Sequence, residues 1–275
     1  MVTAPSPAPP PWRVGNGNSP PARKLAGLPL IASTFGSADR FVGDVTQRVE
    51  EWRGKYRFLL LSDHGFSDFM NKIHLNRWLV EEGYLCMKNG GGDLSGADWN
   101  RSKAYAVGLN SIYLNVAGRE GQGSVPAGEI ETLLSEIKLK LTEWKDADGA
   151  SIVQRVRLKH ETFNGPFTRF GPDLVVGYAP GNRASAETGL GKVPSTSLEP
   201  NHEHWGADHC IEADAVPGVI FANRDLREFG GISFRDIPFL AIGKHLDQSH
   251  IKPPSQAAGE GQKDVEERLK GLGYL

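Results

Sequence analysis

The fold of this chain is decided by residues 58–66, which read FLLLSDHGF. The four apolar residues at the start form a continuous run, which is typical of a strand that is covered on both faces, as in a parallel sheet. Functional side chains of an open α/β sheet gather beyond the carboxyl ends of its strands. The stretch therefore predicts a strand that delivers Asp63 and His64 to that edge. Gly65 lets the backbone turn there, so that carboxylate and imidazole can converge on one divalent cation.

A simpler interpretation of the same residues is a turn that Asp63 starts and Gly65 completes, with His64 as a polar surface residue. The residues alone leave these two interpretations open, because Asp-His-Gly is short enough to arise by chance. A second group, His202, His204 and His209, lies in a segment rich in turn-forming residues, and neutral imidazole binds zinc well. The spacing of the three histidines does not choose among them, and a solvated loop is favoured for His202 and His204 taken singly.

Helices and strands alternate along the rest of the chain. Hydrophobic periodicity predicts helices near residues 37–52, where Ser37 can cap, and near 74–82, 128–144 and 234–246. Strands are predicted near residues 56–61, 105–109, 111–115, 152–158, 173–178 and 218–222. This alternation indicates an α/β fold with a mostly parallel central sheet flanked by helices.

Two regions are predicted. Residues 1–27 are rich in proline, which fixes dihedral angles and buries little surface, so they are expected to form a disordered leader. Residues 28–275 are expected to form one α/β domain, since no later linker is long enough to divide them.

Composition excludes several classes of protein. The net charge of -2, with both signs mixed along the chain, argues against a nucleic-acid polymer as partner. No apolar run reaches the roughly 18 residues that a membrane span needs, so no membrane partner is expected. The two cysteines, Cys86 and Cys210, lie far apart and suggest neither a disulfide framework nor a thiolate zinc site. A reducing, cytoplasmic location is therefore predicted.

Several segments, taken in order, resemble one known family. Residues 62–66 are similar to the Ser-Asp-His-Gly motif of the type I phosphodiesterase/nucleotide pyrophosphatase group, within the alkaline phosphatase superfamily. Further segments resemble its predicted phosphohydrolase/phosphomutase branch, from about Ser37 to about Leu246: DW at 98–99, KAY at 103–105, IYLN at 112–115, GRE at 118–120, GSV at 123–125, PDL at 172–174, WGADH at 205–209 and PGV at 217–219.

The resemblance implies a metal-dependent phosphoester hydrolase with an alkaline phosphatase-like fold. Asp63 and His64 would bind one metal ion, and His209 would bind the other ion of a two-metal site. The expected cation is zinc, with manganese as the alternative, and the expected substrate is a small anionic phosphoester. Possible contacts to the substrate anion are Lys103, Arg119 and Arg183, for which a surface salt bridge is an equally simple interpretation.

The chain departs from the family pattern upstream of Asp63. The nucleophile and an Asp-x-x-x-His pair for the other metal are not found there, so the domain is expected to be N-terminally incomplete, and whether it is an active enzyme is left open. The alternative function is a non-catalytic truncated remnant, or a subunit that needs a separate N-terminal half. An uncovered sheet edge could then also lead to self-association. Sulfate-ester or phosphomutase chemistry ranks below phosphoester hydrolysis. The sequence leaves open the natural substrate, mono- or diester specificity, the metal identity and the oligomeric state.

Overall fold

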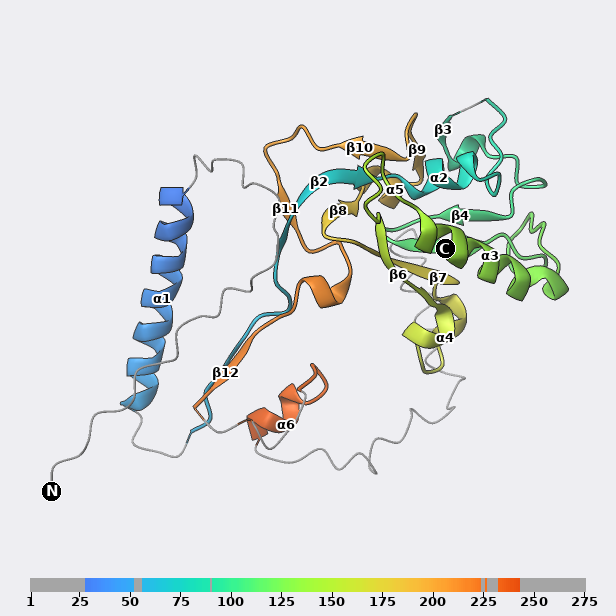
Figure 1. The fold of residues 1–275 in the computed structure, drawn as a ribbon. Coiled ribbons are helices and arrows are strands. Elements are labelled where there is room, and N and C mark those ends of the chain that lie inside the picture. The colour runs from blue at the N-terminus through green and yellow to red at the C-terminus, as the bar shows by residue number, and fades with distance from the viewer. Residues whose placement is uncertain (1–27, 52–55, 90, 224–225, 227–231, 243–275) are drawn as a thin grey trace, which may run out of the picture. The chain divides into compact units, whose positions relative to one another are not determined.

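A computed structural model describes residues 28–51, 56–89, 91–223, 226 and 232–242 (Figure 1). The predicted leader at residues 1–27 and the chain beyond residue 242 lie outside the described residues. The chain divides into two units, Met1–Tyr56 and Arg57–Leu275. Both Asp63 and His209 belong to the second unit, so the candidate centre lies within a single unit.

The first unit contains helix α1, Leu28–Glu50. The prediction that Ser37 caps a helix is wrong, because the helix already begins at Leu28. Ser37 therefore lies inside α1, where its hydroxyl donates a hydrogen bond to the carbonyl of Ser33 at 2.8 Å. Hydroxyl side chains in the interior of a helix commonly bond back to the preceding turn in this way. No helix in the described part of the chain is both long and apolar enough to cross a bilayer.

An antiparallel sheet in the second unit runs in the order β4 (Ala104–Ala106), β5 (Ser111–Leu114), β7 (Leu174–Tyr178), β6 (Val153–Leu158). Helix α3, Ile130–Glu143, follows β5 along the chain and contacts β6. Its buried residues, Leu133, Ile137 and Leu141, recur every fourth position, so one face of the helix is apolar. The predicted helix near 128–144 and the predicted strands near 152–158 and 173–178 are confirmed.

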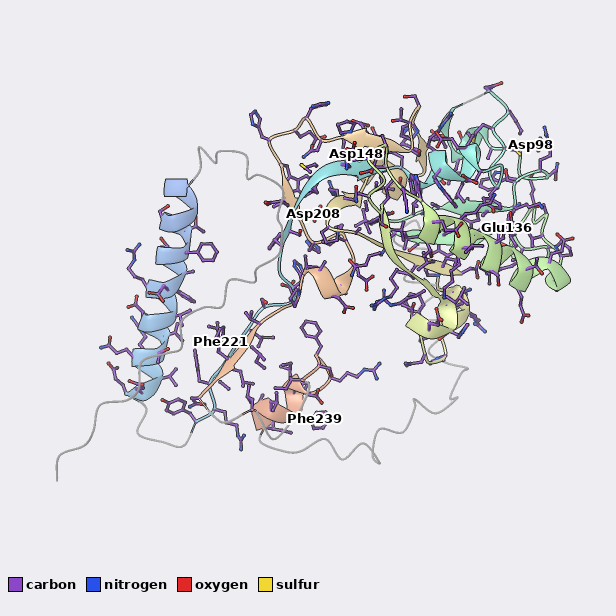
Figure 2. The ribbon with its side chains drawn as sticks, in the orientation of Figure 1. Asp98, Glu136, Asp148, Asp208, Phe221 and Phe239 are labelled. Carbon is purple, nitrogen blue, oxygen red and sulfur yellow. The ribbon has the colours of Figure 1, made fainter. Side chains whose placement is uncertain are left out.

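A second sheet is built around β2, Ser67–Ile73, which pairs with β10 (Leu198–Pro200) and β11 (Ala207–Asp208). Strand β8, Gly181–Ala184, also pairs with β2. Strand β1, Leu59–Leu61, pairs with β12, Ile220–Ala222, on which Figure 2 labels Phe221. The remaining described elements are β3 (Gly92–Asp93) with β9 (Lys192–Val193), helices α2 (Leu75–Glu81), α4 (Lys159–Thr162), α5 (Ala186–Gly189) and α6 (Ile237–Ile242), and 3-10 turns at Leu94–Gly96, Ala127–Glu129, Thr168–Phe170 and Ala213–Ala215.

The fold is mixed α/β, as predicted, but a mostly parallel central sheet is not found. Among the described strands, the β2–β8 pair is parallel and the other paired strands are antiparallel. The apolar run at residues 58–61 suggested a strand buried on both faces. Among the described strands β1 pairs with β12 alone, and Leu61 is 40% exposed. A continuous apolar run therefore marks this strand without indicating the direction of its neighbour.

Candidate metal centre

The turn that follows β1 carries Asp63 and His64, and backbone hydrogen bonds hold it on both sides. The amide of Ser62 donates to the carbonyl of Val219 at 3.0 Å, and the amide of Val219 donates to the hydroxyl of Ser62 at 2.9 Å. Beyond the two site residues, the amide of Gly65 donates to the carbonyl of Val216 at 2.9 Å. The segment around β12 thus fixes where Asp63 and His64 lie.

Strand β11 brings His209 to the same place. It pairs with the beginning of β2 so that Asp208 lies opposite Ser67, and Figure 2 labels Asp208 on this strand. The imidazole rings of His64 and His209 are stacked, with centroids 3.7 Å apart and planes inclined by 15°. Phe66 contacts both rings edge-on, at centroid distances of 5.4 Å from His64 and 5.9 Å from His209. Two histidines separated by 145 positions in the sequence are therefore direct neighbours.

The contacts of His64 favour a cation beside it. Its Nδ1 lies 2.9 Å from the carbonyl oxygen of Gly65, which can only accept a hydrogen bond, so Nδ1 carries the proton. In a neutral ring Nε2 then presents a lone pair, and it faces the carboxylate oxygen Oδ2 of Asp63 at 3.3 Å. The two atoms therefore both present lone pairs to each other. In a tetrahedral zinc site with bonds of about 2.0–2.1 Å, two ligand atoms lie roughly 3.3 Å apart. The distance between Nε2 of His64 and Oδ2 of Asp63 thus fits two ligands of one metal ion.

His209 is oriented by its neighbour in the sequence. Its Nδ1 lies 3.3 Å from Oδ1 of Asp208, while the backbone amides of His209 and Cys210 donate to that same oxygen at 2.7 and 3.3 Å. The Asp208 side chain is only 3% exposed, whereas that of His209 is 45% exposed. A buried carboxylate on one ring nitrogen leaves Nε2 as the nitrogen that can bind a metal, as in carboxylate–histidine–zinc arrangements.

One family has a sequence model that matches this chain. The model described as type I phosphodiesterase / nucleotide pyrophosphatase matches residues 19–204, which is more than half of the chain and includes Asp63 and His64. The chain belongs to the type I phosphodiesterase / nucleotide pyrophosphatase family. This family of the alkaline phosphatase superfamily comprises metal-dependent enzymes, and membership points to hydrolysis of phosphoesters. A search of curated proteins and a search of solved structures each found no match.

Arg183, one of the predicted anion contacts of this family member, pairs with the carboxylate that orients His209. Its Nε is 2.7 Å from Oδ2 of Asp208, and both side chains are almost completely buried. The guanidinium also lies over the rings of Trp205 and Phe69, at 4.2 and 5.1 Å from their centroids. Arg183 therefore offsets the charge of the carboxylate that orients His209, and a contact to substrate stays a prediction.

The other two predicted anion contacts make no bond to the stacked histidines in the described part of the chain. Arg119 donates to both carboxylate oxygens of Asp173, at 2.9 and 2.6 Å, and to Glu120 at 2.8 Å. Lys103 is exposed, and its backbone bonds to Tyr84 and Asn115. Their role in binding a substrate stays a prediction.

Cys210 is close enough to Asp208 and His209 to suggest a thiolate ligand, since one ligand atom from each of the three lies within 4.8 Å of the others. Burial raises the pKa of the Cys210 thiol, and the neighbouring charge of Asp208 raises it further. A raised pKa keeps the thiol protonated, and the protonated form is a poor metal ligand. Imidazole and carboxylate remain the better donors here.

Sequence reasoning did not assign a role to Asp208. A signal was present, because Asp208-His209 repeats the Asp63-His64 dipeptide. In each pair the carboxylate lies 3.3 Å from a ring nitrogen of the histidine that follows it. The two dipeptides differ in burial, since the Asp63 side chain is 81% exposed and that of Asp208 is 3% exposed. Asp63 is thus available as a ligand, whereas Asp208 serves to orient His209.

Replacing Gly65 by alanine is expected to disturb this centre. A Cβ atom there would lie 2.9 Å from the backbone carbonyl oxygen of Pro217, so the turn and the segment before β12 must move apart. We expect a loss of about 1–3 kcal/mol in the free energy of unfolding, together with weaker zinc binding. Urea denaturation and zinc titration measure the two effects. Gly206→Ala is the matched control, since nothing lies within 4 Å of its added Cβ; equal behaviour of the two variants would contradict the prediction.

Proposed function

We propose that this chain is a metal-dependent phosphoester hydrolase that uses zinc. Asp63 and His64 hold one ion and His209 binds the other. The observation that carries the proposal is the stacking of the His64 and His209 rings beside Asp63. Family membership supports the reaction class.

The ring geometry supports two ions rather than one. Metal-binding lone pairs lie in the plane of an imidazole, and the planes of His64 and His209 are nearly parallel. Parallel lone pairs do not converge on a single point, so each ring suits an ion of its own. The ring spacing of 3.7 Å also lies within the roughly 3.5–4 Å that separates the ions of two-metal hydrolytic sites.

The division of work among the residues follows from their contacts. Divalent ions at such a site polarise a phosphoryl oxygen and lower the pKa of bound water. The Asp63 side chain is 81% exposed, so its carboxylate can hold an ion where a substrate can reach it. Asp208 holds Nδ1 of His209, and Arg183 prevents that carboxylate from being a buried, unpaired charge. Phe66 packs against both rings and restricts their rotation.

The proposal is tested with an aryl phosphate monoester and an aryl phosphate diester, with zinc or manganese added. We expect zinc-dependent turnover that is lost on chelation and falls at least about 100-fold in Asp63→Ala and in His209→Ala, because each variant removes a metal ligand. The matched controls are Asp68→Ala and His202→Ala, two exposed residues outside the centre, which should retain activity.

Turnover that survives both the chelator and Asp63→Ala would overturn the metal mechanism. Zinc binding that depends on Asp63 and His209 without any turnover would instead support the non-catalytic alternative. Equilibrium dialysis of the same four variants separates these results, because it reports metal binding independently of activity.

A further inference from the structure

A different group of side chains gathers at the far end of β2. His74 follows this strand and is completely buried, with an exposed fraction of 0%. Its two ring nitrogens face two carboxylates: Nε2 lies 3.0 Å from Oε2 of Glu199 on β10, and Nδ1 lies 3.5 Å from Oε2 of Glu187 on α5. One ligand atom from each of the three residues lies within 4.8 Å of the others.

This group is separate from the centre at His64 and His209. Asp208 pairs with Ser67 at the first residue of β2, whereas His74 comes just after its last residue, Ile73. At about 3.3 Å per residue the strand places its two ends roughly 20 Å apart. A metal ion bound at one end would therefore share no ligand with the other.

One of the two ring nitrogens of His74 makes no hydrogen bond. Nε2 is within hydrogen-bond distance of Oε2 of Glu199, and the ammonium group of Lys72 lies 3.0 Å from Oε1 of the same carboxylate, so Glu199 acts as an acceptor. Nε2 therefore carries a proton, and in a neutral ring Nδ1 then presents a lone pair. Nδ1 is buried and makes no hydrogen bond, and the carboxylate of Glu187 faces it. A buried acceptor that faces another acceptor is unfavourable unless a positive charge lies between them.

We propose that His74 and Glu187 form a second zinc site, with Glu199 as the carboxylate that orients the histidine ring. The separation of 3.5 Å between Nδ1 of His74 and Oε2 of Glu187 is close to the roughly 3.3 Å between two ligands of tetrahedral zinc. Glu199 accepts from the other ring nitrogen, which is the usual outer partner of a metal-bound histidine. Glu187 is 55% exposed, so water completes the coordination and the ion has a route to the site.

Charges around the site are consistent with an added dication. Glu187 and Glu199 contribute two negative charges beside the buried ring of His74. Lys72 offsets part of this charge, but it binds the other oxygen of Glu199, Oε1, at 3.0 Å, and it also binds Glu203 at 3.1 Å. Lys72 thus leaves Oε2 of Glu199 to accept from His74, and it does not pair with Glu187 in the described part of the chain.

The experiment counts the zinc ions that the full chain binds by equilibrium dialysis. The background is a variant with Asp63→Ala, His64→Ala and His209→Ala, which removes the first centre. We expect this background to retain one zinc ion and to lose it when Glu187→Gln is added. Glu203→Gln is the matched control, because Glu203 binds Lys72 but does not contact His74 in the described structure, and it should leave the zinc bound. Glu199→Gln should weaken binding about 10- to 100-fold, as removal of an outer carboxylate does.

The result that overturns the site is a background that is folded by circular dichroism and binds no zinc, or zinc binding that Glu187→Gln leaves unchanged. Should the background not fold, the otherwise unsubstituted chain is compared with its Glu187→Gln variant, which must bind one zinc ion fewer. The 15N resonance of His74 Nδ1, followed as zinc is added, is a direct readout. It shifts if zinc binds to Nδ1, and it stays unchanged if a proton already occupies that nitrogen. Failure here leaves the function proposed for Asp63, His64 and His209 untouched, since those residues are tested separately.

Discussion

Asp173→Asn is expected to lower the free energy of unfolding by about 3–5 kcal/mol, the usual cost of breaking a buried ion pair on one side. The Asp173 carboxylate accepts two hydrogen bonds from Arg119, lies 2.7 Å from Nζ of Lys159 and accepts from the backbone amide of Leu114 at 2.8 Å. Its side chain is 10% exposed, so water replaces little of what is lost. Urea denaturation at pH 7 measures the effect.

The same residue predicts a dependence on pH. Burial raises the pKa of Asp173, but hydrogen bonds from Arg119 and Lys159 outweigh it and hold the pKa below its usual range. A carboxyl group with a depressed pKa in the folded state stabilises the fold above its unfolded pKa, about 3.9 for aspartate, and this contribution is lost as the pH falls through the folded pKa. The difference between the unsubstituted chain and Asp173→Asn should therefore be full at pH 7 and shrink below about pH 4.

The control for Asp173 is Asp148→Asn, an exposed aspartate labelled in Figure 2. A surface substitution of this kind is expected to change stability by no more than about 0.5 kcal/mol. A loss at Asp173 that is equally small, or that does not diminish in acid, would show that the ion pairs with Arg119 and Lys159 contribute little.

Arg183→Met is expected to cost about 3–5 kcal/mol of stability and to weaken zinc binding at His209. The variant keeps an apolar side chain between Phe69 and Trp205, but it removes the charge that lies 2.7 Å from Oδ2 of the buried Asp208. Asp208 is then a buried carboxylate without its cationic partner, and we expect it to move and to orient Nδ1 of His209 less firmly. Urea denaturation and zinc titration follow the two effects.

Arg77→Met is the control for Arg183. Arg77 pairs with Glu81 one turn along α2, and an ion pair of that kind contributes only about 0.3–0.5 kcal/mol. If Arg183→Met is no more costly than Arg77→Met, the buried pair is not what keeps His209 in place. If stability falls but zinc affinity is kept, Arg183 supports the fold without positioning the histidine.

Local sequence patterns predicted those helices and strands whose hydrophobic periodicity lies within the element itself. The buried positions Leu133, Ile137 and Leu141 in α3 follow a helical repeat that can be read without a partner. Pairing of strands could not be predicted in this way. Whether β1 runs parallel or antiparallel to its neighbour depends on residues 220–222, which lie some 160 positions away in the chain. The hydrophobic pattern of residues 58–61 does not determine the direction of the partner strand.

For the candidate site, too, the sequence indicated local segments but not the contacts between them. The motif at residues 62–66 and the segment at 205–209 indicated which histidines matter, through resemblance and not through geometry. The orientation of His209 by Asp208, and the pairing of Arg183 with Asp208, arise because β8 and β11 both pair with β2. His74 was missed because a histidine between a strand and a helix looks like an ordinary boundary residue, and its two carboxylates come from residues 187 and 199.

The bonds that hold the turn at residues 62–66 have a consequence for how the protein is made. The amide of Val219 bonds to the Ser62 hydroxyl across 157 positions of sequence, and the amide of Phe58 bonds to the side chain of Asn223 across 165. A ribosome releases the N-terminal partner of each contact long before the C-terminal one exists, and such distant contacts form slowly. Asp63 and His64 therefore cannot be held in their final positions until most of the chain has been synthesised. A metal ion could therefore bind at the proposed centre only after that point.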